Sequence, residues 1–173
     1  MTGLLVSKNL ADREIVLERE LRGSIEDVWH SWTDAAQLEA WWGPEGWQTT
    51  VRALDVRPGG LWHFGMGPIG SPPDVWVRSI YTEVIAGSAL SYVEGFSDES
   101  GADLDPESQA VTVEFIGVDP DRTRLVMRTR FTSVDRLERI IAMGVVEGWT
   151  SWLTTASRIP LDHLATDGNG LHS

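Results

Sequence analysis

Two pairs of side chains in this sequence could carry chemistry: Tyr81 with Glu83, and Tyr92 with Glu94. The tyrosine and the glutamate of each pair are two residues apart, so in an extended strand they lie on one face. If that face points inward, a buried carboxylate beside a tyrosine could orient a ligand or act as a base. If it points outward, the same residues form solvated cross-strand pairs. The sequence leaves both orientations open.

Histidine is the other residue type suited to acid–base chemistry, and His63 is the strongest candidate because it belongs to an aromatic segment. Strand alternation places His63 opposite Trp62 and Phe64, so we expect it to be exposed or to face an edge. His30 is expected to face solvent, and the two remaining histidines belong to the C-terminal tail. The four histidines lack metal-ligand spacing and the chain has no cysteine, so we expect no metal and no cofactor.

Apolar side chains in the same region could line a pocket for a hydrophobic ligand. Trp62, Phe64 and Met66 share one face of an expected strand, and pockets are walled mainly by apolar side chains. The same three residues could instead only fill a core. The candidate cavity wall also includes Trp42, Tyr81, Tyr92, Glu94, Phe96, Phe115, Met127, Met143, Trp149 and Trp152.

The elements that must position these residues follow from hydrophobic spacing and from turn residues. Ser24 with Asp27, and Asp34 with Gln37, predict the starts of two short helices. Gly43 can take the left-handed position that ends the second helix. The expected strands are 14–21, 48–56, 61–66, 75–85, 89–96, 110–118 and 124–131, and a long last helix is expected over 137–159.

About seven strands joined by short connections predict a mostly antiparallel sheet. A sheet with one apolar face must be covered, and one long amphipathic helix suffices if the sheet curls around it. We therefore expect a single α+β helix-grip domain over residues 12–165, with flexible termini at 1–11 and 166–173. The space between sheet and helix is expected to form a cavity of at least ~300 Å³.

Composition excludes several classes of partner. The net charge of −12 argues against nucleic-acid binding, which usually needs a basic face. No apolar run approaches the ~20 residues that span a bilayer, so we expect no membrane insertion, and the N-terminus lacks the pattern of a signal peptide. The absence of cysteine makes a cytoplasmic location the simplest expectation. Exposed tryptophans and sheet edges offer surfaces for a homodimer, and the oligomeric state stays open.

Five short motifs occur in a fixed order: VWHSWTD at 28–34, LEAWWGP at 38–44, DVRPGGLW at 55–62, YTEV at 81–84 and EGW at 147–149. Taken together, they resemble the bacterial Hsp90-ATPase-activator-homologue-like proteins of the START-like helix-grip superfamily. The resemblance covers about residues 13–159. It implies the fold described above, while related domains bind lipids, hormones, polyketides and other hydrophobic molecules, or act as cyclases, or bind a chaperone.

Three functions are compatible with these features of the sequence. The first is the binding or carriage of a small hydrophobic molecule, supported by the aromatic wall and the lack of a complete catalytic set. The second is a cyclase, dehydratase or hydrolase acting on a bound polyketide-like substrate, with a tyrosine or glutamate moving the proton. The third is a chaperone-associated module, although similar cochaperones carry a further N-terminal domain and only about twelve residues precede the first expected strand here.

Overall fold

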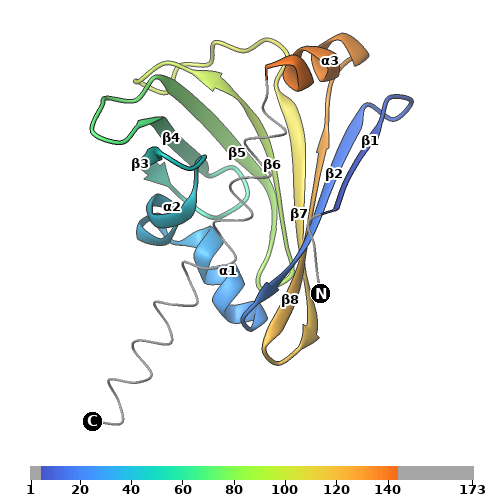
Figure 1. Ribbon diagram of the computed structural model, residues 1–173. Helices are drawn as coiled ribbons and strands as arrows, with labels where there is room; N and C mark the ends of the chain where they lie inside the picture. The colour runs from blue at the N-terminus through green and yellow to red at the C-terminus, as the bar shows by residue number, and fades with distance from the viewer. Residues whose placement is uncertain (1–4, 144–173) are drawn as a thin grey trace.

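The computed structural model describes residues 5–143 of the 173-residue chain (Figure 1). Eight strands and three helices follow one another over this stretch. In chain order they are β1 (Leu5–Asn9), β2 (Glu14–Arg22), α1 (Ile25–Thr33), α2 (Ala35–Trp41), β3 (Trp47–Leu54), β4 (Leu61–Pro68), β5 (Val75–Ile85), β6 (Ala89–Ser97), β7 (Gln109–Asp119), β8 (Arg122–Arg130) and α3 (Val134–Ala142). No helix between residues 5 and 143 is long and apolar enough to cross a bilayer.

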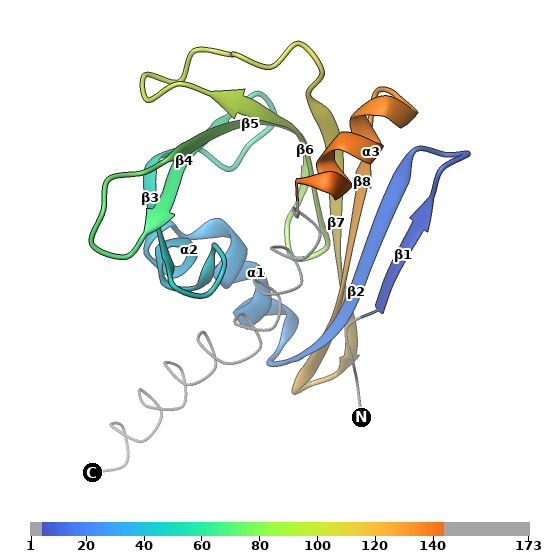
Figure 2. The same ribbon diagram turned by 45° about the horizontal axis from the view of Figure 1, so that its top comes forward.

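All eight strands belong to one antiparallel sheet in the order β1-β2-β8-β7-β6-β5-β4-β3. Short connections join β3 through β8 in sequence order, whereas β2 pairs with β8 from the far end of the described chain. The sheet is strongly curved, so β3 and β1 lie at opposite ends of an arc (Figure 2). The α+β architecture and the antiparallel pairing that the sequence predicts are confirmed.

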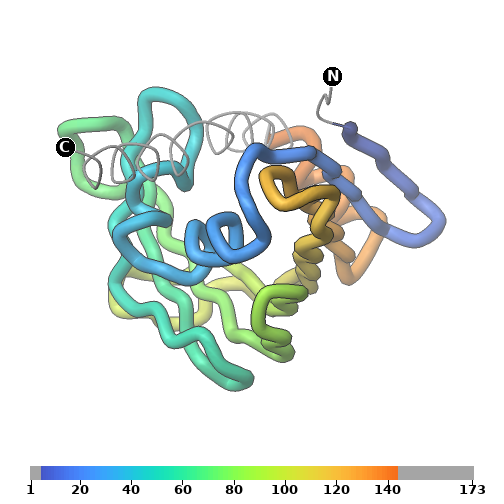
Figure 3. The backbone as a smooth tube through the Cα atoms, turned by 90° about the horizontal axis from the view of Figure 1, so that it is seen from below, coloured from blue at the N-terminus to red at the C-terminus, as the bar shows by residue number. Residues whose placement is uncertain are grey.

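The two short helices lie across the open side of this arc. In the view from below, α1 and α2 occupy the hollow between the two ends of the sheet (Figure 3). α1 contacts β7 and β8, and α2 contacts β3. The hydrophobic core therefore lies between the concave face of the sheet, which we call the inner face, and these two helices.

The first strand was not expected. Residues 1–11 were predicted to form a loose arm, yet Leu5–Asn9 pairs with β2 from Leu5 opposite Glu18 to Asn9 opposite Glu14. All five residues of β1 are exposed, so the strand gains backbone hydrogen bonds without burying a side-chain face. A strand of this kind carries no apolar alternation, which is why the sequence pattern did not reveal it.

The predicted helix caps are confirmed. Ser24 Oγ accepts a hydrogen bond from the Asp27 amide at 3.1 Å, and Asp34 Oδ2 accepts one from the Gln37 amide at 3.0 Å. Each cap satisfies one of the amide groups that the first turn of a helix leaves without a partner. Gly43, two residues after the last residue of α2, has a φ of 107°, a left-handed conformation that glycine adopts without strain.

Replacing Ser24 with alanine is expected to lower the free energy of unfolding by about 1 kcal/mol, because the cap of α1 loses its acceptor. Ser24→Gly is the matched comparison, since glycine at a cap costs only a few tenths of a kcal/mol. Urea denaturation of the two variants tests the assignment. An unchanged free energy of unfolding in Ser24→Ala would show that the hydroxyl does not cap the helix.

The last described helix is the start of the predicted long one. α3 begins at Val134, after its cap Ser133, three residues before the predicted start at 137. Its buried side includes Leu137 and Ile140, which pack into the core. The remaining part of the predicted helix, up to 159, lies outside the described residues.

Candidate functional site

An aromatic wall covers the inner face of β4. Trp62, Phe64 and Met66 alternate along the strand and are all buried, as the sequence pattern predicts for one face. The ring of Trp42 meets Trp62 edge-on with 4.9 Å between the ring centroids, and meets Phe64 at 5.9 Å. Edge-to-face contacts at such distances favour aromatic packing beyond simple burial.

A row of four residues crosses the inner face from this wall. Trp62 on β4 is the register partner of Ser79 on β5, Ser79 is opposite Glu94 on β6, and Glu94 is opposite Gln109 on β7. Residues directly opposite each other in an antiparallel pair point to the same side of the sheet. The Trp62 row therefore brings a hydroxyl, a carboxyl and an amide into line beside the aromatic wall.

A second row lies next to the first. Tyr81 on β5 is opposite Tyr92 on β6, Tyr92 is opposite Val111 on β7, and Val111 is opposite Thr129 on β8. The rings of Tyr81 and Tyr92 meet edge-on with centroids 5.9 Å apart. The polar members of the two rows form what we call the polar band: Ser79, Tyr81, Tyr92, Glu94, Gln109 and Thr129.

Several polar atoms at this site have no partner. Trp62 Nε1, Ser79 Oγ, Tyr81 Oη and Thr129 Oγ1 are buried and make no hydrogen bond within the part of the chain that the structure describes. Buried polar groups are almost always satisfied, so such atoms mark places where a water molecule or a ligand can supply the partner. Three of them belong to the polar band and the fourth, on Trp62, begins its first row, so the polar band together with Trp62 is the candidate binding site.

Glu94 is the titratable group at the centre of the band. Burial raises the pKa of its carboxyl from 4.5 to about 7, although a hydrogen bond from Gln109 and the charge of Arg136 act in the opposite direction. The Gln109 amide nitrogen donates to Glu94 Oε1 at 3.3 Å. The pKa of Tyr92 is raised well above its ordinary value, chiefly by burial and to a lesser extent by the nearby Glu94 and Tyr81. Its phenol therefore keeps its proton.

A buried ion pair fixes α3 above one end of the band. Arg136 Nη2 donates to Asp105 Oδ2 at 2.5 Å and to Gln109 Oε1 at 3.1 Å. The guanidinium also lies over the ring of Phe96, 5.6 Å from its centroid. The chain of contacts from Glu94 through Gln109 to Arg136 therefore links the band to the first turn of α3.

The two tyrosine–glutamate pairs of the sequence prediction separate in the structure. Tyr92 and Glu94 both face inward, which is the orientation that allows them to meet a ligand. A register shift between Tyr81 and Glu83 places Tyr81 inside and Glu83 outside, where it is exposed. The expectation that Tyr81 and Glu83 share a face is therefore wrong, because a β-bulge breaks the period of two.

The predicted exposure of His63 is also wrong. It lies on the face of β4 opposite to Trp62, as expected, but it is buried rather than exposed. His63 Nε2 is 3.1 Å from the carbonyl oxygen of Asp98, and its ring packs against Trp76. The loop after β6 covers this side of the sheet, and strand alternation contains no information about such a cover. His30 is exposed, as predicted.

The remaining candidates fall into three groups. Phe115 and Met127 are buried on the inner face and Phe96 is partly buried beneath Arg136. Met143 follows α3 with 61% of its surface exposed, so the structure does not bring it to the aromatic wall. Trp149 and Trp152 lie outside the described residues, as does the helical side of the predicted cavity, which therefore stays a prediction.

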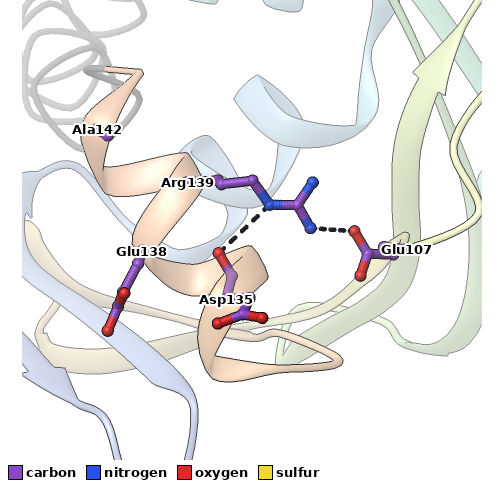
Figure 4. Close-up of a pocket in the computed structure, with 5 residues that line it drawn as sticks. All are labelled: Glu107, Asp135, Glu138, Arg139 and Ala142. Carbon is purple, nitrogen blue, oxygen red and sulfur yellow. Dashed lines mark hydrogen bonds and ion pairs between the residues drawn. The ribbon is translucent and has the colours of Figure 1, made fainter.

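A pocket of about 440 Å³ opens on the outside of α3, away from the polar band. Figure 4 shows Arg139 reaching from α3 toward Glu107, with which it forms an ion pair. Asp135, Glu138 and Ala142 complete the lining. The ion pair joins the surface of the helix to the chain just before β7, so we interpret this pocket as a by-product of helix docking. Within residues 5–143, no three His, Asp or Glu side chains gather in a way that could hold a metal ion.

Sequence reasoning missed five residues of this site: Ser79, Asp105, Gln109, Thr129 and Arg136. Ser79 could have been found, because it lies two residues before Tyr81 and shares its face. Gln109 and Thr129 needed the register of β6, β7 and β8. Asp105 and Arg136 are 31 positions apart, and no local pattern connects a loop aspartate with an arginine on a later helix.

The fold and the band together define a class: α+β domains in which a curved antiparallel sheet presents an aromatic, partly polar inner face. The chain belongs to the family of Activator of Hsp90 ATPase homolog 1-like proteins, whose model matches residues 22–156. This confirms the resemblance that the five sequence motifs indicate. A search of curated proteins finds no match to this chain.

Solved structures share the fold of this chain. A protein from Arthrobacter aurescens is 25% identical, with 91% of both chains covered and a TM-score of 0.84. Protein Ms6760 from Mycobacterium smegmatis is 26% identical over 90% of this chain and 95% of the other, with a TM-score of 0.80. The AHSA1 protein from Silicibacter pomeroyi, at 24% identity, covers 89% of this chain and 99% of its own, and its TM-score of 0.68 shows the shared fold.

Proposed function

We propose that this protein binds a small hydrophobic molecule at the inner face of its curved sheet. The observation that carries the proposal is the combination of a buried aromatic wall with buried polar atoms that make no hydrogen bond within residues 5–143. Ligand sites are typically apolar surfaces with a few convergent polar groups that fix the orientation of the ligand. Trp62, Phe64 and Met66 supply the apolar surface, and the polar band supplies the orienting groups.

The family supports this proposal without specifying the ligand. Domains that resemble this chain include binders of lipids, hormones and polyketides, and a fold alone does not select among such activities. The proposal therefore depends on the residues of the site. Within residues 5–143, the residues that we expect to touch a ligand are the wall of β4 and the band on β5, β6, β7 and β8.

The proposal is tested with an uncharged, environment-sensitive dye, Nile red. Wild-type protein is expected to bind the dye saturably and to shift its emission to shorter wavelength, as transfer from water to an apolar site does. Ser79→Phe fills the middle of the Trp62 row and is expected to weaken binding at least tenfold. Thr129→Phe, which fills the Tyr81 row from β8, is expected to act in the same direction.

The matched control places the same side chain on the other side of the sheet. Val93 is adjacent to Glu94 on β6 but is exposed on the outer face, so Val93→Phe is expected to leave dye binding unchanged. Far-ultraviolet circular dichroism checks that each variant is folded. Equal binding by wild type, Ser79→Phe and Thr129→Phe would contradict a ligand site at the inner face.

A further inference from the structure

We propose that the molecule held at the inner face is uncharged and presents a hydrogen-bond-accepting oxygen, such as a ketone carbonyl, to Trp62, Ser79 and Tyr81. This inference rests on the proposed function and narrows it to a class of ligand. It depends on three features of the site: the kind of polar atoms left without partners, their closeness, and the charges around them.

The unpartnered atoms at this point of the band are hydrogen-bond donors. The indole N–H of Trp62 can only donate, whereas the hydroxyls of Ser79 and Tyr81 can donate or accept. All three atoms are buried and lack a partner within residues 5–143. Burial raises the pKa of Tyr81, so its phenol stays protonated and remains a donor. An acceptor oxygen can satisfy every one of these groups, and a donor group cannot satisfy the indole.

The three donors border one small area of the sheet. Trp62 and Ser79 are register partners, which places their Cβ atoms about 5 Å apart. Tyr81 follows Ser79 by two residues on the same face of β5. The ring of Tyr92 contacts both Trp62, with centroids 5.7 Å apart, and Tyr81, at 5.9 Å. The three residues are therefore neighbours around Tyr92, and this is where the proposal places the ligand oxygen.

The charges near this area disfavour an anionic ligand. Glu94 is directly opposite Ser79, so a ligand carboxylate bound there would face a like charge once Glu94 is ionised. Arg136, the cation in contact with the band, already donates to Asp105 and to Gln109. Its Nη2 is therefore engaged before a ligand arrives. Its Nε has no partner within residues 5–143, but Arg136 contacts the row at Gln109 on β7, two strand positions or about 10 Å from Ser79 on β5.

A second arginine, Arg19, belongs to the inner face but to another part of it. Arg19 is opposite Leu125 and lies four positions along β2 from Ile15, which is opposite Thr129 at the end of the Tyr81 row. β2 and β5 are four strand positions apart in the sheet, about 19 Å along its surface. A carboxylate anchored at Ser79 and Tyr81 is therefore not placed to pair with Arg19.

Three naphthalenes of matched shape test the inference by displacement of Nile red at pH 8: 2-acetylnaphthalene, 2-ethylnaphthalene and 2-naphthoate. The ketone is expected to bind at least tenfold more tightly than the ethyl compound, because only the ketone offers an acceptor to the buried donors. The carboxylate is expected to bind more weakly than the ketone. Equal affinity for the ketone and the ethyl compound, or tightest binding of the carboxylate, would overturn the inference and leave the proposed function intact.

The double variant Ser79→Ala, Tyr81→Phe removes two donors with little change of shape. It is expected to bind the ethyl compound as wild type does and to lose most of the preference for the ketone. If the double variant still prefers the ketone, groups other than Ser79 and Tyr81 donate hydrogen bonds to its carbonyl oxygen. If none of the three naphthalenes displaces the dye from wild-type protein and the dye itself does not bind, the proposed function fails together with the inference.

Discussion

Replacing Arg136 with methionine is expected to lower the free energy of unfolding by about 3–5 kcal/mol, because it leaves the buried carboxylate of Asp105 without its cation. The side chains of Arg136 and Asp105 are only 9% and 3% exposed, and Nη2 lies 2.5 Å from Oδ2. Removing one member of a buried ion pair strands the other charge away from water. Methionine keeps the length and the apolar volume of the arginine stem, so the loss reports mainly on the charge.

Arg139→Met is the matched control on the same helix. Arg139 pairs with Glu107, but both side chains are substantially exposed, and exposed pairs contribute about 0–1 kcal/mol. Urea denaturation of both variants at neutral pH measures the difference. If Arg136→Met costs no more than Arg139→Met, the ion pair does not fix α3 to the sheet.

The double variant Arg136→Met, Asp105→Asn separates the stranded charge from lost packing. It is expected to recover part of the stability, because the remaining asparagine carries no charge. Recovery is incomplete for a structural reason: Asp105 also accepts hydrogen bonds from the amides of Phe96 at 3.2 Å and of Glu107 at 3.0 Å. The bond to Phe96 lies on β6 beyond Glu94 and Gln109, the last register pair of β6 and β7, and the bond to Glu107 lies within the loop before β7.

Replacing Glu94 with glutamine is expected to stabilise the protein at alkaline pH. The pKa of Glu94 is raised from 4.5 to about 7, chiefly by burial, so folding favours the protonated carboxyl. The stability that the folded protein gains from holding this proton is fully present below about pH 4.5. It is lost as the pH rises from there toward 7, because Glu94 ionises first in the unfolded chain and only near pH 7 in the folded protein. Above pH 7 the wild type carries a buried charge that costs about 3 kcal/mol, and glutamine avoids this cost.

Urea denaturation at about pH 5.5 and pH 8 measures the effect. Between these two values the Glu94→Gln variant is expected to gain about 2 kcal/mol relative to wild type. Glu83→Gln is the matched control, because Glu83 belongs to the neighbouring strand and is exposed, and its replacement is expected to change stability by less than about 0.5 kcal/mol at both pH values. A gain for Glu94→Gln that does not depend on pH would contradict a buried, proton-holding carboxyl.

Local sequence patterns were sufficient for most of the fold. The caps at Ser24 and Asp34, the strands and the inner orientation of Trp62, Phe64 and Met66 all follow from residues that are close in the chain. These signals are local because a cap, a turn or a strand face involves positions at most a few residues apart. The exposed strand Leu5–Asn9 was missed for the complementary reason, since its stability comes from pairing and not from its side chains.

The tyrosine–glutamate pairs show where such local reasoning ends. Both pairs have the same spacing, yet Tyr92 and Glu94 share the inner face while Glu83 turns outward after a bulge. A bulge adds one residue to one strand without any clear mark in the sequence. His63 shows a second limit, because its burial depends on a loop that begins 35 positions later at Asp98.

The sequence by itself therefore determined the family, the order of the elements and the aromatic wall, since each depends on residue types at short and regular spacing. Only the tertiary structure decided the site. Strand register brought Ser79, Glu94 and Gln109 into one row with Trp62, and the docking of α3 placed Arg136 at its end. Register and docking are set by the packing of distant segments, so the polar band exists in the folded sheet and has no counterpart in the linear chain.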